Sequence, residues 1–132
     1  MILLTIYDFC NTNNTFRAEF SKAPPAKEGN QSPLESYLSL VSHLFQHSFR
    51  SMRATNYSLL ALYTLQLLVE DPVSVGALCH KDSQLLIHFC RQKPPHLPLV
   101  RGKRPAACAI MDMVVDAINH NLRRKLDITL YQ

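Results

Sequence analysis

Two amphipathic helical segments, within the run from Ser32 to Pro72, constrain the fold of this chain more than any other feature. Apolar residues in the first segment recur at the spacing of one helical face, at Leu34, Tyr37, Leu38, Val41, Leu44, Phe45 and Phe49. The second segment follows a short turn at residues 50–53 and repeats that spacing at Tyr57, Leu60, Ala61, Leu65 and Leu68. Two such helices cannot bury both apolar faces by themselves, so the pattern predicts a helical bundle or an α-solenoid.

Capping signals mark the ends of these helices. Ser32 and Glu35 form a capping box, in which each side chain can accept a hydrogen bond from the other residue's backbone N–H. Pro33 occupies the first helical position, where a missing N–H costs nothing. Asp71 and Pro72 end the second helix and can begin a short third one. We therefore expect helix boundaries at residues 32 and 71.

Composition limits the class of protein. The chain has 132 residues, which suggests one domain over residues 1–132, and its 47% hydrophobic content is too high for general disorder. A net charge of +4 without interleaved aromatic motifs gives no reason to expect a nucleic-acid partner. No run approaches the ~20 apolar residues of a membrane span. Without a signal peptide, we expect the four cysteines to be reduced thiols of a cytosolic protein: Cys10, Cys79, Cys90 and Cys108.

The remaining segments are helices and polar loops. Residues 1–11 form an apolar helical run, and residues 15–20 form a further turn or two. Residues 21–31 and 92–104 are rich in proline and predict loops, whereas residues 83–90 fit either a helical turn or an extended segment. A last helix begins near Pro105, and its apolar face is expected to be core: Cys108, Met111, Val114, Val115, Ile118 and Leu122. Both chain ends fall inside apparent helices, so we expect a fragment of a longer protein.

The order and spacing of these segments resemble the armadillo-like helical domain-containing protein 3 family, in its fungal-type form. The closest similarity is the run Arg104–Val115, continued by Leu126–Tyr131. Similar helix segments occur at residues 2–7, 34–46 and 59–71, and a similar turn occurs at residues 78–82. The resemblance implies an armadillo-type α-solenoid in the cytosol and at the Golgi membrane. It also implies a scaffold that supports Golgi organisation and secretion through lipid-kinase and Arf-activation machinery.

Candidate chemistry is sparse. His43 and His47 share a helical face, but they lack the glutamate of the metalloprotease motif. A denser group of potential zinc ligands lacks the close cysteine pair of structural zinc sites: Cys79, His80, His88 and Cys90. No nucleophile elbow or phosphate-binding glycine loop is present, so no catalytic residue and no cofactor are assigned. A small zinc-binding domain is the alternative function. A small enzyme would need an active-site cleft, and no sequence motif indicates one.

Basic residues flank the last helix, at Arg101, Lys103 and Arg104 on one side and at Arg123 and Arg124 on the other. They could contact an anionic membrane or an acidic protein, at about 1 kcal/mol per residue near a charged bilayer. They could equally be a solvated loop and cations that match the helix dipole. We therefore predict an all-α, armadillo-like α-solenoid fragment of stacked helical hairpins with Pro-rich loops. Its expected function is that of a non-enzymatic scaffold for protein partners, with those five residues as candidate contacts.

Overall fold

The computed structural model of the chain describes residues 2–22, 32–80, 84–85 and 104–124. Most of the predicted loop at 92–104, most of the linker at 21–31 and the predicted helix start at 127–132 lie outside these residues. The described part is all-α, as predicted, with one short pair of strands. Its elements are α1 (Ile2–Thr12), α2 (Asn14–Lys22), α3 (Pro33–His47), the 3-10 turn η1 (Ser48–Arg50), α4 (Met52–Glu70), α5 (Pro72–Cys79), β1 (Gln84–Leu85), β2 (Arg104–Pro105) and α6 (Ala106–Arg124).

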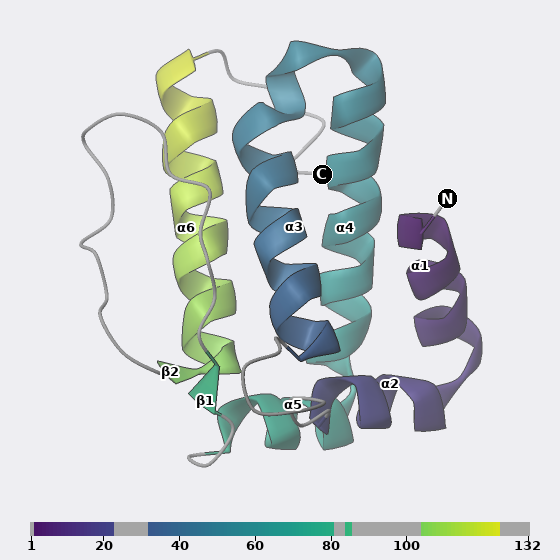
Figure 1. Cartoon of the computed structure of the whole chain (residues 1–132). Helices are drawn as coiled ribbons and strands as arrows, with labels where there is room; N and C mark the ends of the chain where they lie inside the picture. Colours follow the sequence, from purple (N-terminus) through teal and green to yellow (C-terminus); the bar gives the residue numbers. More distant parts are fainter. Residues whose placement is uncertain (1, 23–31, 81–83, 86–103, 125–132) are drawn as a thin grey trace.

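The helices form a layer that is closed at one end. Figure 1 shows α6, α3, α4 and α1 side by side, while α5 and α2 run across one end of this layer. Helix α4 packs against α3 on one side and against α1 on the other. Its apolar residues are spread nearly all round the helix, and this two-sided packing is what such a distribution predicts.

Both predicted capping signals form in the structure. The backbone N–H of Glu35 donates to Ser32 Oγ over 3.1 Å, and the N–H of Ser32 donates to Glu35 Oε2 over 2.7 Å. At the other boundary, Asp71 Oδ2 accepts from the N–H of Ser74 over 2.8 Å, and the nearby hydroxyl and N–H of Ser74 lower the pKa of Asp71. Because Asp71 has an extended backbone and Pro72 begins α5, the chain bends by 91° between α4 and α5.

The core lies where α3 faces α4, as the stripe on α3 predicts. Leu38 and Val41 of α3 and Ala61 and Leu68 of α4 are fully buried. The Tyr37 hydroxyl donates to the carbonyl of Ala61 over 3.4 Å and is buried, which raises the pKa of Tyr37 above its usual range. The two predicted apolar stripes therefore supply most of the buried apolar side chains between α3 and α4. Phe49 and Tyr57 are the exceptions, since both are exposed.

The open question at residues 83–90 is answered in part. Gln84 and Leu85 are extended and pair in antiparallel register with Pro105 and Arg104 respectively. This pairing joins the chain after α5 to the residues immediately before α6. It therefore helps to fix the point at which α6 begins, close to the predicted Pro105.

The orientation of α6 differs from the prediction. Helix α6 turns a different face toward the core, with Ala106, Ala109, Ile110 and Met113 buried. The expected core face is instead largely outward, with Met111, Val115, Ile118 and Leu122 exposed. Alanine side chains let α6 approach its neighbours closely, and Gln46 Nε2 of α3 donates to Asp116 Oδ2 of α6 over 2.6 Å. Helical periodicity located one apolar face of α6, but it could not show that another face packs inward.

Candidate interaction surface

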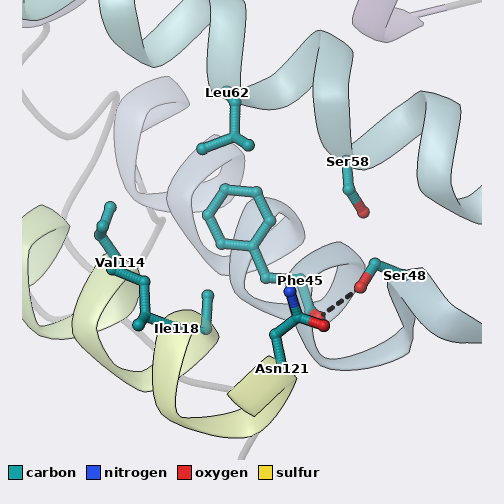
Figure 2. A pocket seen from close by; sticks show the side chains of 8 residues that line it. Phe45, Ser48, Ser58, Leu62, Val114, Ile118 and Asn121 are labelled. Carbon is teal, nitrogen blue, oxygen red and sulfur yellow. Dashed lines mark hydrogen bonds between the residues drawn. The ribbon is translucent and has the colours of Figure 1, made fainter. Parts of the chain in front are cut away.

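A pocket opens where α3 and η1, α4 and the C-terminal half of α6 meet. Its volume is about 120 Å³, and its walls are mostly apolar. Figure 2 shows the ring of Phe45 among Leu62 of α4 and Val114 and Ile118 of α6. The other lining residues are Ser48, Ser58, Ala117 and Asn121. A cavity of this size can hold one branched aliphatic side chain, because an apolar protein cavity of about 150 Å³ accepts benzene.

The two hydroxyl groups on the pocket wall are already engaged by the backbone. Ser48 Oγ donates to the carbonyl of Phe45 over 3.1 Å, which is the dashed line in Figure 2. Ser58 Oγ lies 3.0 Å from the carbonyl of Leu44 and 2.9 Å from that of Ala54. These bonds leave neither serine poised as a nucleophile, since no histidine or carboxylate of the pocket lining activates it. The pocket is therefore suited to an apolar group.

The exposed residues of α6 form a second apolar feature. Met111, Val115, Ile118 and Leu122 are 64%, 41%, 39% and 54% exposed. At 100° per residue they fall within about 60° of one another around the helix axis. We call these four residues the α6 stripe. Ile118 belongs to both the stripe and the pocket lining, so the two features adjoin.

Of the five predicted basic contacts, the structure describes the side chain of Arg104. Arg104 is part-buried and forms an ion pair with Asp112, which lies in the second turn of α6. Arg123 and Arg124 lie in the last turn of α6, and Arg101 and Lys103 lie outside the described residues. Because α6 is 19 residues long, about 27 Å separates its two ends. Arg104 and the Arg123–Arg124 pair therefore stand at opposite ends of the helix, and the prediction of a shared basic contact remains a prediction.

The potential zinc ligands are only partly described. Cys79 ends α5 as an exposed free thiol, and the backbone N–H of His80 caps the helix by donating to the carbonyl of Ala77 over 3.3 Å. His88 and Cys90 lie outside the described residues. Within residues 2–22, 32–80, 84–85 and 104–124, no three histidine, cysteine or carboxylate side chains gather into a metal site. The zinc hypothesis thus receives no support from the described part of the chain.

Two other groups identified from the sequence have clear surroundings. The rings of His43 and His47 lie 4.2 Å apart, and partial burial lowers the pKa of His43, helped by the neighbouring charges of His47 and Arg50. His47 Nδ1 lies 2.8 Å from the carbonyl of His43, so that nitrogen is occupied within the helix.

The Cys10 thiol is fully buried, and burial raises its pKa to about 11 against the opposing effect of Arg17. Neither arrangement is that of an activated catalytic group.

Sequence reasoning missed the pocket and the polar contact beside it. The pocket needs residues from α3, α4 and α6, which no local spacing brings together. One signal was present: Gln46 falls on the buried face of α3, where an amide requires a polar partner. That partner is Asp116 of α6.

Comparison with known proteins gives two matches. A sequence model described as "Armadillo-like helical domain-containing protein 3, C-terminal" matches residues 104–132. The chain is also similar to the UPF0588 membrane protein C20F10.02c of Schizosaccharomyces pombe, with 25% identity over 130 residues. That match covers 98% of this chain but only 21% of the relative, so the chain spans about a fifth of the relative's length. No solved structure matches the chain.

The relative is named a membrane protein, which raises the question of whether any helix of this chain has the length and hydropathy of a bilayer span. Among the described residues, no single helix is long and apolar enough to cross a membrane. Helices α4 and α5 meet that threshold only when taken together, and they are bent by 91° at their junction. Several of the α4 residues concerned are core residues of the helical layer, including Ala61, Leu65 and Leu68.

Proposed function

We propose that this chain, which resembles the armadillo-like helical domain-containing protein 3 family over residues 104–132, works as a non-enzymatic helical scaffold. The observation that carries the proposal is the pocket between α3, α4 and α6. Its wall is mostly apolar and its serine hydroxyls are bonded to the backbone. Such a pocket recognises an inserted apolar side chain and provides no group that makes or breaks bonds.

The mechanism is the insertion of one anchor side chain from a protein partner. Phe45, Leu62 and Ile118 come from three different helices, so the pocket exists only while the layer is assembled. An apolar anchor that fills such a pocket usually dominates the binding energy, and the contacts around it mainly exclude water. Partner binding by this chain therefore depends on the folded arrangement of α3, α4 and α6.

The family resemblance suggests where this scaffold acts. We propose a peripheral location at the Golgi membrane, with partners in the lipid-kinase and Arf-activation machinery that supports secretion. Arg101, Lys103, Arg104, Arg123 and Arg124 would then add electrostatic attraction to acidic partners or anionic lipid. Reversing the charge of all five should weaken membrane recovery, whereas unchanged recovery at moderate salt would remove that part of the proposal.

The pocket can be tested by filling it. Ala117→Leu adds a branched side chain from the pocket wall, and it should leave the melting temperature unchanged or raised because it fills empty space. Gly76→Leu is the matched control on α5, where nothing lies within 4 Å of an added Cβ. Partners of the tagged chain would be quantified by mass spectrometry for wild type and both variants. We expect Ala117→Leu to lose a defined set of partners that Gly76→Leu keeps. Identical partner sets for all three proteins would refute the pocket as the binding site.

A further inference from the structure

The turn between α3 and α4 exposes apolar and basic side chains side by side. Five consecutive exposed residues, which we call the hairpin tip, form it: Phe49, Arg50, Ser51, Met52 and Arg53. Phe49 is 45% exposed and Met52 is 78% exposed. A single exposed apolar side chain is ordinary on a protein surface. Here two of them stand next to arginines at the end of a helical hairpin, so the tip combines apolar area with positive charge.

Hydrogen bonds hold the hairpin tip in shape. Thr55 Oγ1 lies 2.8 Å from the carbonyl of Ser48, which joins the first turn of α4 to η1. Ser51 caps α4 through its hydroxyl oxygen, which accepts from a backbone N–H of the first turn over 3.1 Å. The ring of Phe49 lies 5.6 Å from that of His120, so α6 supports one side of it. The tip is therefore already ordered, and a ligand that binds it meets a small entropic cost.

The charge of the hairpin is entirely positive near the tip. Between Glu35 and Glu70 the chain has no carboxylate, and its lysines and arginines there are Arg50 and Arg53. Glu35 lies in the first turn of α3 and Glu70 ends α4, so roughly 20 Å of helix separates each from the tip. That distance exceeds the Debye length of about 8 Å at physiological salt. Helix α6, which ends with Arg123–Arg124, has its C-terminal end at the same end of the layer (Figure 1).

We infer that the hairpin tip is a docking surface for an anionic lipid bilayer. Phe49 and Met52 enter the headgroup region, and Arg50 and Arg53 lie against the lipid phosphates. A bilayer has no fixed shape to match, so a few side chains at the end of a hairpin are enough to engage it. A specific protein interface instead uses about 20–30 residues on each side, many more than the tip supplies. The inference rests on the peripheral membrane location proposed above, and it assigns to that location a surface separate from the pocket.

Vesicle flotation of the 132-residue chain tests the inference. Wild type should bind phosphatidylcholine vesicles that contain about 30% phosphatidylserine at least tenfold more strongly than pure phosphatidylcholine vesicles. Arg53→Gln removes one cation, and Met52→Gln removes one apolar side chain of similar size. Each should lower the partition coefficient on the anionic vesicles about fivefold.

Matched controls change the same residue types outside the tip. Lys22→Gln removes an exposed cation at the end of α2, and Met111→Gln removes a 64% exposed methionine from α6. Both should bind within about twofold of wild type, since neither residue lies in the tip. Circular dichroism verifies that all variants keep the helical content of wild type. Absence of wild-type binding to anionic vesicles, or equal losses in the tip variants and their controls, would overturn the inference.

Insertion of the tip can be observed directly, because the chain has no tryptophan. Phe49→Trp introduces a single emitter, whose fluorescence should shift to shorter wavelength on anionic vesicles and be quenched by brominated lipid chains. Tyr63→Trp is the control, since Tyr63 is a 53% exposed residue of α4 about 15 Å along the helix from Arg53. Its emission should not shift. Bound protein in which the Phe49→Trp emission is unshifted would contradict insertion of the tip.

An acidic protein is the other class of ligand that the tip could contact, and the same variants distinguish it. If Met52→Gln and Arg53→Gln lose protein partners by mass spectrometry but keep wild-type vesicle binding, the tip is a protein contact and the inference is wrong. The result is separate from that for the pocket, because Ala117→Leu leaves the tip intact and the tip variants leave the pocket lining intact.

Discussion

The hydrogen bond between Gln46 and Asp116 should restrain the orientation of α6 against α3. Gln46 is 4% exposed, and its Nε2 donates to Asp116 Oδ2 over 2.6 Å across the contact between α3 and α6. Asp116→Ala removes the acceptor and leaves a buried amide donor without it. Loss of a hydrogen bond to a charged group costs about 1.5–3 kcal/mol. Alanine recovers up to ~0.7 kcal/mol through its higher helix propensity, so we expect a net loss of about 1–2.5 kcal/mol.

The control for this prediction is Asn119→Ala in the same helix. Asn119 is exposed, so its replacement should change the free energy of unfolding by less than about 0.5 kcal/mol. Urea unfolding followed by circular dichroism measures both variants, and the slope of the transition should stay constant. A double-mutant cycle with Gln46→Met, which removes the donor at similar volume, should give a coupling energy above about 1 kcal/mol.

Two results would contradict this reasoning. Equal stabilities of Asp116→Ala and Asn119→Ala would mean that the bond between α3 and α6 contributes nothing to the folded state. A coupling energy below about 0.5 kcal/mol would mean that Gln46 and Asp116 act independently. In either case the packing of the alanines and Met113, not the polar contact, would have to determine which face of α6 is buried.

Four further predictions follow from individual groups. Ser32→Ala removes a buried cap and should cost about 1 kcal/mol in urea unfolding, whereas Ser36→Ala on the exposed side of the same turn should be nearly neutral. Maleimide labelling at pH 7 followed by peptide mapping should modify exposed Cys79 in the folded protein and Cys10 only after unfolding, because burial raises the pKa of Cys10 to about 11. The pKa of His43 is lowered by burial and by His47 and Arg50, so the folded state binds fewer protons than the unfolded chain. Stability should therefore decrease as the pH falls through about 6.5, and His47→Gln should raise the pKa of His43 in an NMR titration. Elemental analysis of the purified chain should find less than roughly a tenth of an equivalent of zinc, and a full equivalent would support the predicted zinc site at Cys79, His80, His88 and Cys90.

Local signals predicted the helices well because each helix end is determined by a few adjacent residues. Ser32 with Glu35, and Asp71 with Pro72, set boundaries that the structure reproduces. The stripe on α3 also predicted its buried face, since α3 lies in the middle of the layer and buries most of its apolar residues. The all-α class was confirmed by the structure, and the family resemblance was confirmed by the sequence comparisons. Both predictions depend on the order and spacing of the helices.

Tertiary contacts determined the two features that the sequence did not predict, the buried face of α6 and the pocket. Helix α6 has apolar residues on two faces, and the more hydrophobic one, with Met111 and Leu122, was expected to be buried. The structure buries the alanine-rich face because small side chains permit close packing and because Asp116 meets Gln46 across the contact. The pocket likewise depends on three helices that are far apart in the sequence. Neither outcome is encoded in a single segment.

The pairing of Gln84–Leu85 with Arg104–Pro105 has a consequence for how this chain can vary and be engineered. It brings together the two ends of an 18-residue connection, residues 86–103, independently of what that connection contains. Lengthening a loop whose ends are already held costs little, about 0.6 kcal/mol for each doubling in length. A flexible insert placed between Leu85 and Arg104 should therefore leave the helical layer unchanged as long as this strand pairing forms.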